Sequence, residues 1–159
     1  MIRQASSQDF EFIFRLYMHP QSNIFLLYEP MPPDEFLPIF NDLLEKKIKY
    51  VFEHDGAPVG MFKLIPATHR NAHVAFVGGL AIDPAQAGRG HGFAMMSALK
   101  EYCRQRGFLR IELSVDMGNV PAYNLYKKSG FEEEGLLKKY VYLRSRREYV
   151  DGIMMACLL

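Results

Sequence analysis

The sequence contains no tryptophan and only two cysteines among its 159 residues. Two cysteines cannot build the set of disulfides that holds a small secreted domain together. Cys103 and Cys157 both lie within apolar periodic stretches. We therefore expect two buried free thiols.

The sequence also lacks a long hydrophobic segment. Its longest uncharged runs are too short to span a bilayer. The N-terminal stretch MIRQASSQDFEF carries acidic residues and no apolar stretch of the kind found in signal peptides. These absences predict a cytoplasmic protein that has no membrane partner.

No excess of charge of either sign is present. The 19 Lys and Arg residues nearly balance the 18 Asp and Glu residues, which leaves a formal net charge of +1. Proteins that bind nucleic acids usually carry a basic excess or a basic block. The most basic stretch, LRSRRE at 143–148, is short and includes an acidic residue, which is typical of a solvated hairpin turn. We expect no nucleic-acid partner.

Hydrophobic residues make up 49% of the chain, which is enough for a substantial core. The length predicts a single domain over residues 1–159. Apolar periodicity predicts its elements in order. They are a strand at 2–5, helices at 8–18 and 35–48, a hairpin at 49–66, a strand at 72–83, a helix ending near 106, a strand at 109–116, a helix at 121–129 and two final strands.

Turn and capping residues set the expected ends of these elements. Ser7 is the predicted N-cap of the first helix and Asp34 that of the second, with Pro38 in the first turn of the second helix. Asp55-Gly56 predicts the hairpin turn, Gly107 predicts the end of the long helix, and Gly130 predicts the end of the short helix at 121–129. The mixture of meander and alternating elements predicts an α/β fold with a mixed sheet.

The stretch DPAQAGRGHGFAMMSAL at 83–99 places glycines at 88, 90 and 92 directly before a helix. It matches neither the G-x-G-x-x-G pattern of dinucleotide-binding folds nor the G-K-[ST] ending of a P-loop. A strand that leads into such a loop can present backbone N–H groups and the positive end of a helix dipole to an anion. The alternative is a mobile turn without a ligand.

Two segments resemble the GNAT superfamily of N-acetyltransferases. LAIDPAQAGRGHGFAMMSAL resembles the superfamily's motif A, R/Q-x-x-G-x-G/A, with Gly90 and Gly92 at the small positions. Ala87 stands where that motif has Arg or Gln. NVPAYNLYKKSGFEEEG resembles motif B and begins at Asn119. The resemblance implies a mixed, mostly antiparallel sheet with a central, splayed pair of parallel strands and about four helices.

The resemblance also implies acetyl-CoA as co-substrate and no metal. The chain's ending is similar to a bacterial branch that acetylates amino acids or small amines. By the same resemblance the residues that contact coenzyme A are Leu80, Ile82, Ala87, Gly88, Arg89, Gly90, His91, Gly92, Phe93, Asn119 and Tyr126.

Two features of the sequence then acquire catalytic roles. Gly78-Gly79 within an apolar strand indicates a bulge, which in the resembled family turns the backbone N–H of Leu80 toward the thioester. The alternative is that these glycines only relieve crowding. The resemblance makes Tyr126 the acid that protonates the departing thiolate, whereas a structural reading makes it a core residue. Tyr123, one helical turn earlier, is the competing tyrosine.

No residue stands out as the general base. The position of the strand glutamate found in some family members falls on Phe76. The candidates are His73 on the same strand, Glu112 on the next strand and Glu29 in the proline-rich loop. Loss of the proton through ordered water is the alternative.

The segment at 19–34 offers a clue to the acceptor. It contains four prolines and a run of large apolar residues, and by resemblance it covers the acceptor site, with Phe25, Leu27, Tyr28 and Glu29 as its contact residues. The segment's scarcity of acids favours an apolar acceptor, such as a hydrophobic amino acid, over a polyamine. The alternative is that its aromatic side chains fill the core or a dimer interface.

The sequence therefore predicts an enzyme, a small-molecule N-acetyltransferase that works by direct attack in a ternary complex. Two other functions stay open. One is a protein or peptide N-terminal acetyltransferase, and the other is a catalytically idle acetyl-CoA sensor. The C-terminal strands could also pair with a second copy in a homodimer.

Overall fold

A computed structural model describes residues 1–159 and contains one seven-stranded sheet. The strand order is β1-β2-β3-β4-β5-β7-β6, and only β4 and β5 run parallel. The mixed, mostly antiparallel sheet is therefore confirmed. The strands are β1 (Ile2–Gln4), β2 (Lys49–His54), β3 (Ala57–Pro66), β4 (Val74–Ile82), β5 (Arg110–Asp116), β6 (Glu132–Leu143) and β7 (Glu148–Leu158).

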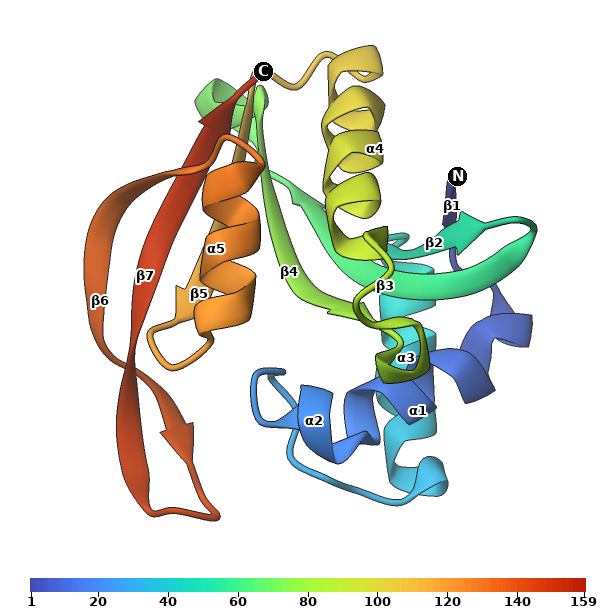
Figure 1. Ribbon diagram of the computed structural model, residues 1–159. Coiled ribbons are helices and arrows are strands. Elements are labelled where there is room, and N and C mark those ends of the chain that lie inside the picture. The colour runs from blue at the N-terminus through green and yellow to red at the C-terminus, as the bar shows by residue number, and fades with distance from the viewer.

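Five helices cover the two faces of this sheet. One hydrophobic cluster joins α1 and α3 to β2 and β3, and a second, larger cluster joins α4 and α5 to the central strands. Figure 1 shows α1, α2 and α3 grouped in the lower part of the view and α4 and α5 in the upper part. The helices are α1 (Phe10–Met18), α2 (Pro20–Asn23), α3 (Pro33–Glu45), α4 (His91–Gln105) and α5 (Val120–Lys128).

The expected turn chemistry is mostly confirmed. Asp55 and Gly56 have φ of 52° and 77°, so both adopt the left-handed conformation that a tight hairpin needs. Gly107 and Gly130 follow the ends of α4 and α5 with φ of 79° and 86°. The two cysteines are buried and free.

The N-terminal ends of the first two long helices were predicted wrongly. Ser6, not Ser7, caps a short 3₁₀ turn that precedes α1, because the Asp9 carboxylate accepts a hydrogen bond from the Ser6 N–H at 2.7 Å. Pro33 opens α3, since proline fits the first helical position, and Asp34 lies inside its first turn. Pro38 consequently falls in the second turn.

The central strands part midway along their length. β4 pairs with β5 only from Val74 to Val77. In the pairing with β3, Met61 lies opposite Ala81 and Lys63 opposite Gly78, so β4 has one residue more than β3 in this interval. This is the expected bulge, and Figure 1 shows β4 and β5 diverging beyond it.

The conformation of this bulge requires glycine at position 79. The φ of Gly79 is +56°, and a Cβ placed there would lie 2.8 Å from the Tyr17 hydroxyl oxygen. Tyr17 is fully buried in the cluster under α1 and α3, so it cannot move away freely. The bulge is therefore tied to the packing of α1.

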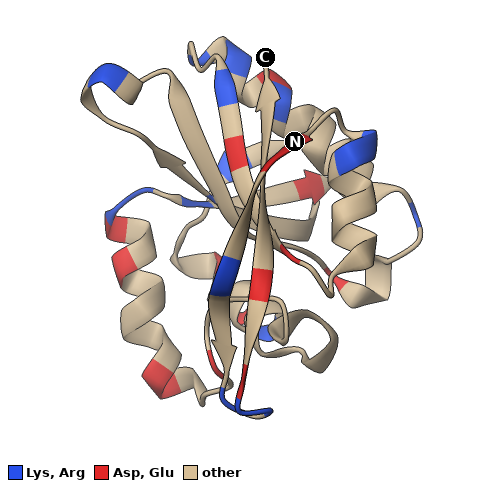
Figure 2. Ribbon diagram, turned by 90° about the vertical axis from the view of Figure 1, so that its left-hand side faces the viewer, with Lys and Arg blue, Asp and Glu red and all other residues tan.

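None of the helices has both the length and the apolar character that crossing a bilayer requires. Figure 2 shows Lys and Arg distributed over many elements and interspersed with Asp and Glu. The hairpin turn at 144–147 is exposed, as expected from its basic sequence.

Replacing Gly79 by alanine should lower the free energy of unfolding by about 1–3 kcal/mol, because the new Cβ meets Tyr17 and the left-handed φ is strained. Gly135→Ala is the matched control, since Gly135 also lies in a strand and has nothing within 4 Å of an added Cβ. Urea denaturation measures both. An equal effect of the two substitutions would contradict the assigned constraint.

Candidate active site

The parting of β4 and β5 opens a cavity of about 160 Å³. Residues 77–82 of β4 form one wall, and residues 114–116 of β5 form the opposite wall. Asn119, directly before α5, and Tyr126, within α5, close one side, and Phe25 from the segment after α2 closes another. The fold therefore brings the bulge, the helix tyrosine and the predicted substrate loop to one place.

The two helix tyrosines have different surroundings. Tyr126 is only 6% exposed, lines the cavity and makes no side-chain hydrogen bond, and burial raises its pKa to about 12. The Tyr123 hydroxyl instead donates a hydrogen bond to Glu133, which raises the Tyr123 pKa. Tyr126 is thus a phenol that stays protonated at ordinary pH and has a hydroxyl without a protein partner.

Asn119 has a structural role beside its place in the cavity. It is the N-cap of α5, and its side-chain oxygen accepts a hydrogen bond from the Ala122 N–H at 3.2 Å. Leu80 and Ile82 line the cavity as well. Gly79 and Leu80 have no paired residue in either neighbouring strand, because they form the bulge.

The glycine loop follows β4 directly and leads into α4. Gly88 and Gly90 have φ of 76° and 82° and open space around them, so they supply the backbone turn. Gly92 differs, because its added Cβ would lie 3.1 Å from Leu125 of α5. It therefore permits close packing of α4 on α5. Gly90 caps α4 without a side-chain hydrogen bond.

Asp83 fixes the beginning of this loop. Its carboxylate accepts hydrogen bonds from the Ala85 N–H at 3.0 Å and from the Arg15 guanidinium at 2.9 Å. Ala87 and Arg89 are exposed in the loop, and His91 is buried beside the His54 ring. Phe93, a predicted coenzyme A contact in the first turn of α4, is 43% exposed.

A second cavity of about 180 Å³ adjoins the first on the side of the α2–α3 segment. Both cavities share Phe25, Gly78, Gly79 and Asp116 among their lining residues. The second cavity is mostly apolar, and its floor includes one lysine, Lys63. Its apolar lining residues are Ile24, Phe25, Leu26, Leu27, Phe76, Tyr140 and Val141.

The predicted substrate loop divides between two roles. Phe25 and Leu27 line the second cavity. The Tyr28 ring packs against Tyr17, with 5.0 Å between centroids, and so belongs to the core. Glu29 is exposed and lines a third cavity, between this loop and the β6–β7 hairpin.

The structure brings none of the three candidate bases to the parted strands. His73 is exposed before β4, six residues and about 20 Å of extended chain from Gly79. The Glu112 carboxylate accepts a hydrogen bond from Arg110 at 2.8 Å and lies opposite the paired part of β4. Glu29 lines only the third cavity. No group of three or more metal-ligating side chains occurs.

Sequence reasoning missed two charged residues of the site. Asp116 ends β5 and lines both cavities, and Lys63 lies in the apolar stretch of β3. Parallel neighbours end at the same sheet edge, so the last residue of β5 could have been placed beside the end of β4. Lys63 is the single charged residue within the apolar run MFKLIP, and this isolated charge could have marked it as a candidate site residue.

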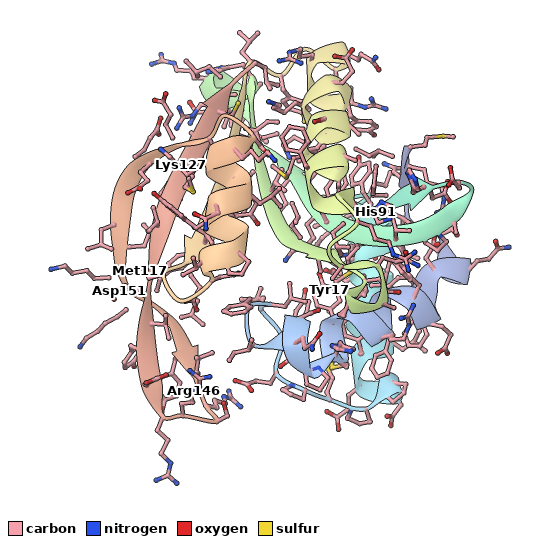
Figure 3. The ribbon with its side chains drawn as sticks, viewed as in Figure 1. Tyr17, His91, Met117, Lys127, Arg146 and Asp151 are labelled. Carbon is pink, nitrogen blue, oxygen red and sulfur yellow. The ribbon has the colours of Figure 1, made fainter.

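A buried lysine lies next to this site. Lys49 is 1% exposed, and its Nζ donates a hydrogen bond to the Tyr17 hydroxyl at 3.1 Å. Burial lowers the pKa of Lys49 well below its usual value, and the charge of Lys63 lowers it further. Burial raises the pKa of Tyr17. Figure 3 shows Tyr17 on α1, below the start of α4 at His91.

Comparison with known proteins is consistent with these features. The profile of the acetyltransferase (GNAT) family matches residues 10–131. The L-amino acid N-acetyltransferase AaaT of Escherichia coli is 35% identical, and the match covers 98% of this chain and 96% of that protein. The spermidine N(1)-acetyltransferase of the same species is 24% identical over 97% of this chain and 83% of its own.

Two solved structures have the same fold. The spermidine N-acetyltransferase of Vibrio cholerae, in complex with CoA and spermine, superposes with a TM-score of 0.85 at 23% identity, over 99% of this chain and 94% of that one. The ribosomal-protein-alanine N-acetyltransferase of Brucella melitensis superposes with a TM-score of 0.80 at 20% identity, over 100% of this chain and 99% of that one.

Replacing Lys49 by methionine should change how stability depends on pH. Because the folded-state pKa of Lys49 is lowered, the unfolded chain binds its proton more readily, and wild-type stability rises with pH between the folded and unfolded pKa values. The Lys49→Met variant lacks this contribution. The stability of the wild type relative to Lys49→Met should therefore rise as the pH approaches the ordinary lysine pKa of about 10.4, by up to about 1.4 kcal/mol per pH unit.

Urea denaturation at several pH values measures this difference. The control is Lys138→Met, which removes an exposed lysine from β6. A difference between wild type and Lys49→Met that is constant across the pH range would show that Lys49 is not a desolvated amine.

Proposed function

The chain belongs to the acetyltransferase (GNAT) family, and we propose that it transfers an acetyl group from acetyl-CoA to the amine of a small α-amino acid with an apolar side chain. One observation carries the proposal. The bulge at Gly79 opens a cavity that holds Tyr126 and continues into an apolar cavity under the 24–28 segment. The match with an L-amino acid N-acetyltransferase along almost the whole chain supports the acceptor class.

The residues of the loop and of β4 fit coenzyme A. The first N–H groups of α4 have no intrahelical acceptor, and Gly90 places no side chain over them. Such N–H groups suit the oxygens of a pyrophosphate. Residues 79–82 of β4 lie beyond the part of β4 that pairs with β5. Their main-chain groups on that side are therefore available to pair with the extended pantetheine arm of coenzyme A. Acetyl-CoA supplies the thioester that carries the acetyl group.

Tyr126 would act as the general acid. Its pKa of about 12 keeps the hydroxyl protonated, and because Tyr126 lines the cavity and makes no side-chain hydrogen bond, the hydroxyl is free to donate to a departing thiolate. The backbone N–H of Leu80, in the bulge, would donate to the carbonyl oxygen as negative charge develops there. Direct attack requires the amine and the thioester to be bound side by side. The two cavities share lining residues, so molecules bound in them would lie next to each other.

The amine must lose a proton before it attacks. Asp116 is the carboxylate that lines both cavities, with one oxygen accepting a hydrogen bond from the Gly118 N–H at 2.7 Å. Water ordered by the Asp116 carboxylate is the route we propose for this proton. The cytoplasmic location expected from the sequence stays a prediction.

Release of free thiol from acetyl-CoA tests the proposal. The panel contains L-amino acids with apolar and polar side chains, a polyamine and short peptides. We expect turnover with apolar amino acids. Turnover with peptides alone would favour a peptide acetyltransferase, and acetyl-CoA binding without turnover on any amine would favour a sensor.

Replacing Tyr126 by phenylalanine should lower kcat by about 100-fold or more, because the departing thiolate loses its proton donor. Acetyl-CoA binding and stability should change little, since the hydroxyl makes no hydrogen bond in the protein. The matched control is Tyr123→Phe, which removes the hydroxyl one helical turn away. Steady-state kinetics and calorimetric titration measure the two effects. Unchanged kcat in Tyr126→Phe would refute the assignment.

A further inference from the structure

Lys63 is a cation without an acidic partner. Its side chain forms no salt bridge and no hydrogen bond, although it is only partly exposed. Its Cε lies 3.3 Å from the place of a Cβ on Gly79, and its Nζ lies 5.6 Å from the centre of the Tyr28 ring. The lysine therefore lies along the bulge, at the floor of the second cavity.

A second lysine, Lys49, lies beneath this floor. Lys49 and Lys63 are paired residues on β2 and β3, so their side chains leave the same face of the sheet. Lys49 also has no acidic partner, and the only hydrogen bond of its side chain goes to the Tyr17 hydroxyl. Burial lowers the pKa of Lys63. An anion bound in the cavity would offset the cost of placing two amines in this poorly solvated region.

The rest of the cavity has a complementary arrangement. Asp116 is the one carboxylate among its lining residues, and it also lines the cavity that holds Tyr126. Phe25, Leu27 and Phe76 supply apolar walls. The cavity therefore offers a cation, an anion close to the reacting centre, and an apolar surface.

We infer that Lys63 binds the carboxylate of the acceptor and thereby selects α-amino acids over amines that lack one. Within the proposed function, on which this inference rests, the α-amine lies toward Asp116 and the side chain lies against the apolar walls. Lys49 and Tyr17 act as positioning residues, because their hydrogen bond supports the floor beneath Lys63.

The same charges disfavour polyamines. A polyamine would bring further positive charge to a floor that carries Lys63, and like charges in a poorly solvated site repel strongly. The acceptor preference of this chain should therefore differ from that of the spermidine N-acetyltransferase that shares its fold.

The test compares L-leucine with L-leucinamide, which keeps the amine and the side chain and removes the negative charge. In the wild type, kcat/KM should favour L-leucine. Lys63→Met should reduce the ratio of kcat/KM values by about 10- to 100-fold, since a charge-assisted hydrogen bond is lost. The loss should come mainly through the KM for L-leucine, with L-leucinamide little affected. Lys63→Arg should restore part of the preference.

The control is Lys127→Met, which removes an exposed lysine on α5. An equal loss on both substrates in Lys63→Met, or a wild type that does not prefer the carboxylate, would overturn the inference. Calorimetric titration of both ligands in the presence of CoA keeps the test independent of turnover. If no amine is acetylated, the proposed function fails. The inference then stands only if L-leucine binds and Lys63→Met abolishes that binding.

Discussion

The bulge at Gly79 is the constraint on which the site depends. One extra residue in β4 ends its pairing with β5 at Val77, and the space beyond becomes two adjoining cavities. The bulge needs a left-handed backbone and room for the Tyr17 hydroxyl, and glycine satisfies both conditions. Because Tyr17 belongs to the core under α1 and α3, the packing of the N-terminal helices and the shape of the site are linked.

The polar groups of the site are arranged at a cost to stability. Lys49 is buried without an acid, and Tyr126 lines the cavity without a side-chain hydrogen bond in the protein. Polar groups left in this way destabilise a folded chain, and they are retained where a ligand completes their contacts. The apolar core around them, from Phe36 and Phe40 on one face to Met95 and Leu99 on the other, offsets that cost.

Local signals predicted much of this structure. Asp55-Gly56 specified its turn, Gly107 and Gly130 ended their helices, and Gly78-Gly79 indicated the bulge, because each acts through the backbone of its own neighbourhood. Lys63 and Asp116 could not be assigned in the same way, since their role comes from elements that meet only in the folded chain. His73 shows the reverse case, because its chemistry suits a general base but its place at the start of the strand keeps it far from the bulge. The choice of Tyr126 over Tyr123 rested on motif B and is supported by burial and by the hydrogen bond that engages Tyr123.

A crystal structure of the protein with CoA and an apolar L-amino acid would test the central claim most directly. We expect the pantetheine arm to run along residues 79–82 of β4, with its sulfur beside the Tyr126 hydroxyl. We expect the amino acid in the second cavity, with its carboxylate on Lys63. CoA bound away from the parted strands, or an amino acid whose carboxylate points away from Lys63, would contradict this arrangement.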